Sequence, residues 1–147
     1  MSADNYQNLS SLKNNLQWIR QYCDTVQTYL DFINYDFERF IENEMVQDAC
    51  LSKISQISEC ITRIRDKYPE IYTRYFAPSL NGVTGLRNFT THQYERVKMN
   101  LVWEFLTTEI TRIESTSVRV LDEMYKDLPN ESFNNKIKSV FNRKRRL

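Results

Sequence analysis

Three long stretches of this sequence carry apolar residues at alternating spacings of three and four, and this spacing restricts the fold more than any other feature. It is the period of one face of an α-helix. No segment shows the strict alternation of a half-buried strand, so the sequence predicts an all-α, up-and-down bundle of four to five helices. The stripe positions are Leu9, Leu12, Leu16, Ile19, Cys23, Val26, Leu30 and Ile33; then Val46, Cys50, Ile54, Ile57, Ile61, Ile64 and Tyr68; then Val102, Phe105, Leu106, Ile110, Ile113, Ser117, Val120, Met124 and Leu128.

Shorter elements are predicted between the stripes. The run Asn34-Tyr35-Asp36 interrupts the first helix, and a short helix over residues 37–42 follows with Asp36 as its N-cap. Pro69 ends the second helix, because proline disfavours helical geometry at the residue before it. One or two further turns are expected over residues 71–76.

A loop is predicted around Pro78, Gly82 and Gly85, and the two glycines are the only ones in the chain. A helix resumes from Leu86 to about His92, and the third long helix stops at Pro129. We therefore expect a single helical domain over residues 1–128 and a C-terminal extension over residues 129–147 that ends in a basic tail.

The composition indicates an ordinary water-soluble protein. The net charge is +1, so no global field favours nucleic acid or an anionic membrane. No stretch has the length and apolar character of a membrane span or a signal peptide. Three widely spaced cysteines, Cys23, Cys50 and Cys60, form no CxxC pair and are predicted to be core residues of a reducing compartment. The expected location is the cytoplasm.

The residues most suited to chemistry lie together after the glycines, in the run Arg87-Asn88-Phe89-Thr90-Thr91-His92-Gln93-Tyr94. His92 is the chain's single histidine, and an imidazole exchanges protons near neutral pH. Arginine presents a fixed fork of donors that suits phosphate. On a regular helix the side chains of Arg87 and His92 point about 140° apart around the helix axis. They can therefore meet only if the helix ends or bends at the motif, or if a second copy of the chain supplies a partner.

This residue set favours metal-free cleavage of RNA. The sequence carries no P-loop, no GxGxxG, no GxSxG and no ligand spacing typical of a zinc or two-metal site. In RNA the 2′-hydroxyl serves as the nucleophile, an imidazole moves the proton, and a guanidinium stabilises the phosphorane. Such a reaction needs a base and an acid, so a chain with one histidine predicts an active two-fold dimer. No cofactor and no metal are expected.

The sequence resembles the HepT-like members of the HEPN superfamily, which are ribonuclease toxins of type VII-like toxin–antitoxin modules. The Arg87–Tyr94 run fits the Arg-x4-His-x-Tyr pattern with its usual Asn after the Arg. Segments on both sides of the motif also resemble the family, in the order in which the family has them, and the resemblance covers roughly residues 12–128. These segments are Phe40 to Ala49, Ile57-Ser58-Glu59-Cys60, Tyr68-Pro69-Glu70-Ile71, Val97, and Val102-Trp103-Glu104.

The resemblance implies a homodimeric helical HEPN-type ribonuclease in which Arg87 and His92 are catalytic and Asn88 supports them. It implies RNA, either tRNA or mRNA, as substrate. It also implies a partner, a minimal MntA-like nucleotidyltransferase antitoxin that adds AMP to Tyr94. A bulky anionic group two residues from His92 would block RNA and repel its phosphates. No membrane contact is implied.

The sequence departs from the family pattern at several places. The stretch 75–84 is longer than the family's short link, Lys98 replaces a usual Asp, and Gln93 replaces a common Gly. The loop and Lys98 favour an alternative, a non-catalytic helical binding module that partners a nucleotidyltransferase.

Two further groups of residues complete the sequence predictions. Asp48 and Glu59, on the second long helix, are either supports for His92 or Arg87 from across the bundle or parts of a solvated helix face. The aromatic residues are predicted to lie in the core or a dimer interface rather than to stack on bases, namely Trp18, Tyr22, Tyr29, Trp103 and Phe105.

Overall fold

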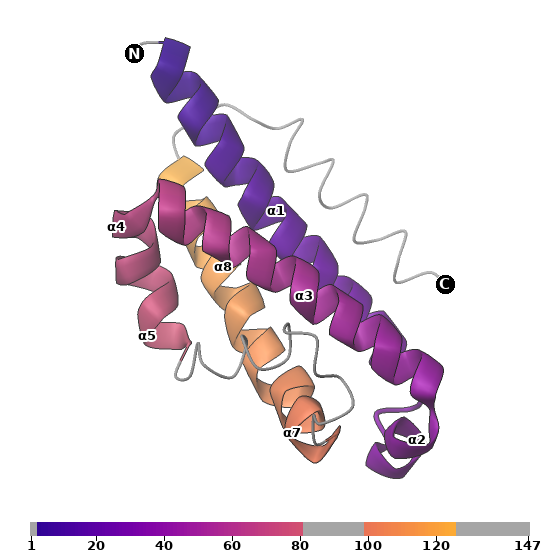
Figure 1. Cartoon of the computed structure of the whole chain (residues 1–147). Coiled ribbons are helices and arrows are strands. Elements are labelled where there is room, and N and C mark those ends of the chain that lie inside the picture. Colours follow the sequence, from indigo (N-terminus) through magenta and orange to yellow (C-terminus); the bar gives the residue numbers. More distant parts are fainter. Residues whose placement is uncertain (1–2, 81–98, 126–147) are drawn as a thin grey trace.

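The structure, a computed structural model, describes residues 3–80 and 99–125 (Figure 1). Two long helices are α1 (Ala3–Phe32) and α3 (Glu44–Lys67). A third long helical segment is made of α7 (Met99–Glu104), η3 (Phe105–Glu109) and α8 (Ile110–Tyr125). No strand occurs within the described ranges, so the predicted all-α bundle is confirmed.

Helix α1 lies against both α3 and α8 and runs antiparallel to each of them. On the α3 side, Asn15 pairs with Arg63, whereas the later residue Tyr22 meets the earlier residue Lys53. On the α8 side, the Lys13 ammonium lies 5.3 Å from the centroid of the Tyr125 ring. The bundle is therefore up-and-down, as the sequence predicted.

A tight turn joins α1 to α2 (Phe37–Glu42). Asn34 and Tyr35 both take positive φ, 56° and 52°, and the Tyr35 N–H donates to the Leu30 carbonyl at 2.9 Å. Asp36 then caps α2, since its carboxylate accepts from the Arg39 N–H at 3.1 Å. The short helix and its N-cap are both confirmed.

Side chains also close the junction between α2 and α3. The Asn43 carbonyl oxygen Oδ1 accepts from the Val46 N–H at 3.0 Å and caps α3. The Gln47 amide donates to the carbonyls of Phe40 at 2.7 Å and Ile41 at 2.9 Å. The Phe40 carbonyl also accepts from the Asn43 N–H at 3.2 Å. Carbonyls at the end of a helix lack partners from a following turn, so Gln47 supplies donors to the end of α2.

The segment after α3 is helical for longer than the sequence predicted. Pro69 stops α3 as expected and begins α4 (Pro69–Ile71), which continues through η1 (Tyr72–Phe76) and α5 (Ala77–Ser79). The predicted loop at Pro78, and the reading of residues 75–79 as part of a long link, are therefore wrong. Pro78 lies inside this continuous helical segment, although it has no N–H to donate to a carbonyl of the preceding turn. The Thr116 hydroxyl donates to Ser79 Oγ at 2.9 Å and ties α5 to α8.

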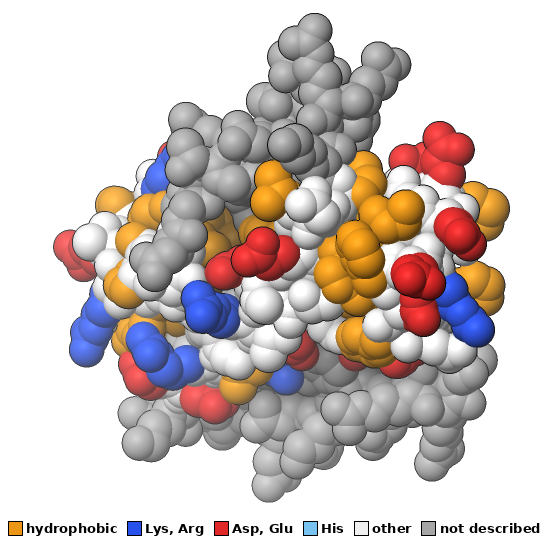
Figure 2. All heavy atoms as spheres, turned by 90° about the horizontal axis from the view of Figure 1, so that it is seen from below, with side chains coloured by type: hydrophobic (Ala, Val, Ile, Leu, Met, Phe, Trp, Pro, Cys, Tyr) orange, Lys and Arg blue, Asp and Glu red, His pale blue; other side chains and the backbone are white. Residues whose placement is uncertain are grey.

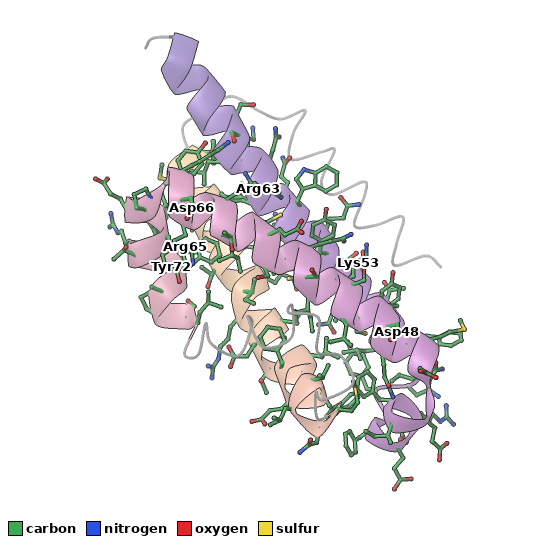
Figure 3. All side chains as sticks on the ribbon, viewed as in Figure 1. Asp48, Lys53, Arg63, Arg65, Asp66 and Tyr72 are labelled. Carbon is green, nitrogen blue, oxygen red and sulfur yellow. The ribbon has the colours of Figure 1, made fainter. Side chains whose placement is uncertain are left out.

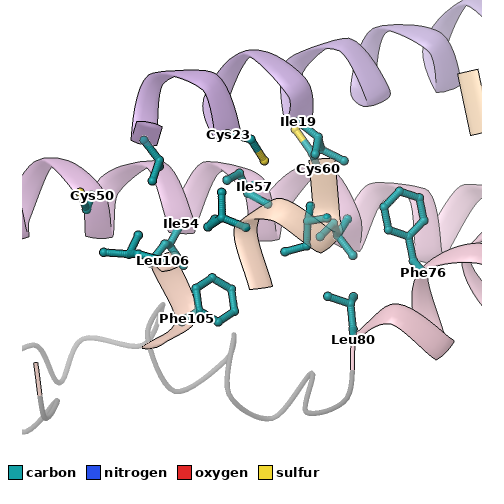
Figure 4. Close-up of a cluster of buried hydrophobic side chains, with 14 of the residues drawn as sticks. Ile19, Cys23, Cys50, Ile54, Ile57, Cys60, Phe76, Leu80, Phe105 and Leu106 are labelled. Atoms are coloured by element: carbon teal, nitrogen blue, oxygen red, sulfur yellow. The ribbon is translucent and has the colours of Figure 1, made fainter. Parts of the chain in front are cut away.

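The apolar stripes meet in one core (Figure 4), to which η1 adds Tyr75 and Phe76. Nearly all predicted stripe residues of the described ranges are buried. Met124 is an exception at 37% exposed, because Leu121 and Tyr125 occupy the core side of the last turn of α8. Among the aromatic residues predicted to lie in the core or a dimer interface, Tyr22, Tyr29 and Trp103 pack against the core and Phe105 is buried in it. Trp18 is 48% exposed and is therefore not a core residue of this chain, so a dimer interface stays the prediction for it.

All three cysteines are buried and free, as predicted. Burial raises the pKa of the Cys50 thiol to about 12. Burial also raises the pKa of Cys23 and of Cys60, although a hydrogen bond from Arg63 to the Cys60 sulfur partly offsets the latter shift. The thiols are therefore protonated core residues at neutral pH.

The Cys50 thiol makes the fold sensitive to alkali. Its folded-state pKa is raised, so its contribution to stability is complete below the unfolded-state pKa and is lost as the pH rises toward 12. The free energy of unfolding of the wild type should fall between pH 9 and 12 more steeply than that of Cys50→Ala, by about 1.4 kcal/mol per pH unit. Urea unfolding across this pH range measures both slopes.

A matched control is Ile54→Val, which removes a methyl group from the same helix and keeps the thiol. It should lower stability equally at every pH. Parallel pH profiles for wild type and Cys50→Ala would contradict the assignment to Cys50.

Candidate functional site

The residues of the predicted motif, Arg87, Asn88, His92 and Tyr94, lie outside the residues that the structure describes. What the structure gives is the frame to which their segment is attached. The chain enters the segment after Leu80, which is buried, and returns to the described fold at Met99, which packs against the core. Helix α7 begins at Met99 and is the described element closest in sequence to Tyr94.

Helix α7 is held against α2 by an aromatic cluster. The Trp103 ring lies 5.7 Å from the centroid of Phe37 and 5.2 Å from that of Phe40, both in tilted arrangements. Phe40 is fully buried, and so is Val102 beside Trp103. Tilted aromatic pairs contribute beyond their buried area. The first described turn after the motif therefore has a fixed position relative to α2.

A wide helical turn follows α7 directly. In η3 the Ile110 N–H reaches back to the Phe105 carbonyl, one residue further than in an α-helix. Two threonine hydroxyls bond to carbonyls of the preceding turn: Thr107 to Trp103 at 2.8 Å and Thr108 to Glu104 at 2.6 Å. Such wide turns are frequent at functional sites, where they change the direction of side chains.

Large apolar side chains remain exposed where α1, α2, α3 and α7 end or begin. Met45 is 82% exposed and Phe32 is 76% exposed. We call this surface the α2–α7 end and define it by Phe32, Phe37, Ile41, Met45 and Leu101. Figure 2, which views the molecule from below, shows hydrophobic side chains gathered there. Exposed apolar side chains that gather on one surface are typical of interaction sites.

The side chains around the α2–α7 end are mainly acidic, as the red groups beside the hydrophobic ones in Figure 2 show. Exposed carboxylates occur at Asp36, Glu38, Glu42, Glu44 and Asp48. Such a rim repels phosphate, so protein fits this surface better than RNA does.

Asp48 and Glu59 are both exposed on α3, and Figure 3 shows Asp48 near the start of that helix. They are separated by about 16 Å along the helix axis. One imidazole therefore cannot contact both carboxylates. Whether either supports Arg87 or His92 stays a prediction, because both partners lie outside the described ranges.

Across residues 3–80 and 99–125, no group of three or more His, Cys, Asp and Glu side chains is placed to hold a metal ion. In the same part of the chain, no helix combines the length and apolar character needed to cross a membrane.

Comparison with known proteins identifies the class. The sequence profile described as "Ribonuclease HepT-like" matches residues 13–120, a span that contains most of α1, the whole of α3, most of α8 and the whole Arg87–Tyr94 run. The chain belongs to the HepT-like ribonuclease family, and the resemblance drawn from the motif is confirmed.

Two relatives come from Methanocaldococcus jannaschii. "Putative RNase MJ0125" is 28% identical over 115 residues, which cover 72% of this chain and 93% of that protein. "Putative RNase MJ1216" is 27% identical over 110 residues, which cover 72% of this chain and 84% of that protein. No solved structure gives a significant match.

The sequence analysis missed the exposed apolar residues of the α2–α7 end. A signal was present, because Phe32, Ile41 and Met45 fall outside the apolar stripes. An apolar residue off the stripe of an amphipathic helix faces solvent unless another element covers it.

The two tryptophans of the chain provide a matched test of the aromatic cluster. Trp103→Ala removes a ring that packs on Phe37 and Phe40, so the free energy of unfolding should fall by about 3 kcal/mol. Trp18→Ala removes a half-exposed ring and should cost about 1 kcal/mol or less. Urea unfolding followed by circular dichroism measures both; equal losses would contradict the role given to Trp103.

Proposed function

We propose that this protein is a metal-independent endoribonuclease whose reaction is carried by Arg87 and His92, with Asn88 in support. The observation that carries the proposal is the family match, which spans the whole motif. The names of the two relatives support the same class of activity.

The proposed reaction needs no group beyond RNA and these side chains. A base takes the proton of the 2′-hydroxyl, the 2′-oxygen attacks phosphorus, and the P–O5′ bond breaks as an acid protonates the leaving oxygen. The products are a 2′,3′-cyclic phosphate and a 5′-hydroxyl end. Arg87 stabilises the negative charge that develops on the phosphorane oxygens. Asn88 orients the reacting groups.

The need for both a base and an acid supports a homodimer as the active species. The chain contains one histidine, so a second proton-transfer group of the same kind comes from a second copy. The α2–α7 end supports this proposal, since it exposes apolar side chains at helix ends and includes Leu101 of α7, the element that directly follows the motif segment.

Regulation by a cognate MntA-like nucleotidyltransferase forms the second half of the proposal. The Tyr94 hydroxyl attacks the α-phosphate of ATP, pyrophosphate leaves, and the proton of the hydroxyl passes to solvent. The AMP group then adds bulk and negative charge two residues from His92, which excludes an RNA phosphate. In this form the protein is the toxin of a type VII-like toxin–antitoxin system.

Cleavage of RNA by purified protein tests the proposed roles of His92 and Arg87. In EDTA, the purified wild type should cleave single-stranded RNA to ends that carry 2′,3′-cyclic phosphate, and His92→Ala and Arg87→Ala should each lose at least about a hundredfold in rate. Arg112→Ala is the matched control, since it removes an exposed arginine of α8 and should retain full activity. Gel analysis of end-labelled RNA measures the rates.

Three outcomes are decisive. Equal cleavage by wild type and His92→Ala would contradict the assignment to His92. Inactive wild type with the mass of the unmodified chain would favour the non-catalytic binding module. Inactive wild type with the added mass of AMP, lost in Tyr94→Phe, would support the proposed regulation.

The second prediction concerns assembly. Met45→Asp places a charge in the proposed apolar interface and should weaken the dimer at least tenfold. Met124→Asp makes the same change at the far end of α8 and should leave the dimer intact. Sedimentation equilibrium measures both, and a dimer insensitive to Met45→Asp would place the interface elsewhere.

A further inference from the structure

Two aromatic rings form an exposed stack on α1. The Trp18 and Tyr22 centroids are 5.8 Å apart and their planes differ by 20°, which is a stacked arrangement. Trp18 is 48% exposed, so part of this side chain is accessible to solvent. The sequence predicted that this ring lies in the core or a dimer interface, and its exposure excludes the core.

Two cations of α3 flank the stack. The Lys53 ammonium lies 5.2 Å from the Tyr22 centroid and donates to Gln56 Oε1 at 3.0 Å. The Arg63 guanidinium donates to Asn15 Oδ1 at 2.9 Å and to the Cys60 sulfur at 3.3 Å. These bonds use two of the five N–H donors of the guanidinium. Figure 3 shows Lys53 and Arg63 along α3, and they are about 15 Å apart by helical rise.

One carboxylate, Glu59, also lies on this face and is close enough to Tyr22 to act on its hydroxyl electrostatically. A carboxylate disfavours phosphate but accepts hydrogen bonds from amino groups on base edges. Its position on α3 between Lys53 and Arg63 therefore suits a strand whose phosphates meet the two cations and whose bases meet the rings.

We propose that the α1–α3 aromatic face, made of Trp18, Tyr22, Lys53 and Arg63, binds single-stranded RNA. A base stacks on Trp18, and the flanking phosphates contact Arg63 and Lys53. Stacking requires an unpaired base, so duplex RNA binds weakly. This inference deepens the proposed ribonuclease function and rests on it for the identity of the ligand.

Charge separates this face from the α2–α7 end. The α2–α7 end is apolar with an acidic rim, whereas the α1–α3 aromatic face pairs open rings with two cations. Aromatic stacking combined with cationic side chains is the usual means by which proteins hold single strands without reading a long sequence.

The test uses the full chain with His92→Ala as background, so that RNA is not cut during titration. Binding of a short fluorescein-labelled single-stranded RNA is followed by anisotropy. Adding Trp18→Ala should weaken binding roughly tenfold, while Trp18→Phe should retain most of the affinity. Arg63→Gln and Lys53→Gln should each reduce the slope of log K against log salt by about 0.7. Arg112→Gln, on α8, should change neither quantity.

Tryptophan fluorescence distinguishes contact between Trp18 and RNA from a merely structural role of Trp18. Titration with RNA should quench tryptophan emission in the parent protein, because a base contacts Trp18. In Trp18→Phe the quenching should vanish although binding persists, since Trp103 is the tryptophan left.

The outcomes separate this inference from the proposed function. If the Trp18→Ala variant binds RNA as tightly as its parent and the wild type cleaves RNA in EDTA, the inference is overturned and the proposed function stands. Loss of the dimer in Trp18→Ala would overturn it in favour of a protein interface on this face. Trp18-dependent binding without cleavage would support it and contradict the nuclease. A protein that neither cleaves nor binds RNA would overturn both.

Discussion

The packing of α1 against α3 and α8 at the same time is the contact on which the rest of the structure depends. Leu16, Ile19, Cys23, Val26 and Leu30 along α1 are fully buried, and each Å² of apolar surface removed from water contributes about 25 cal/mol. Because both partners run antiparallel to α1, this contact fixes which side chains meet across the bundle. Arg63 reaches Asn15, and Lys53 reaches Tyr22, only in this register.

The segment that carries the motif is attached to this framework at both of its ends. Leu80 is buried at one end, and Met99 packs against the core at the other. Beyond Met99, Trp103 joins α7 to α2, and α2 is in turn closed onto α3 by the caps of Asn43 and Gln47. Reactive groups need positions fixed to a fraction of an ångström, and rigid neighbouring elements supply them. The short helix α2 thus helps to fix the position of α7, the first described element after the motif.

The net charge of +1 conceals two surfaces of different character. One is apolar with carboxylates around it, which suits a protein partner. The other combines the exposed Trp18 and its stacked partner Tyr22 with Lys53 and Arg63, and this combination is the basis of the proposed RNA-binding face. A folded chain acts through local potentials, because charges further apart than a Debye length of about 8 Å are largely screened from one another. Whole-chain charge therefore gave no indication of either surface.

The sequence by itself determined the helical class, the long apolar stripes, the stops at Asn34 and Pro69, the Asp36 cap and the burial of the cysteines. These features follow from local geometry and from apolar periodicity, which neighbouring residues set. The family also followed from sequence, through the order of residues in the Arg87–Tyr94 motif and its flanks. Tertiary structure alone decided that Pro78 belongs to a helix, that Met124 turns outward, and that the Tyr22 ring, on which the exposed Trp18 stacks, meets Lys53 of α3. Those outcomes depend on which helices pack together and in which register, and contacts between residues far apart in the chain leave no periodic signal in either partner.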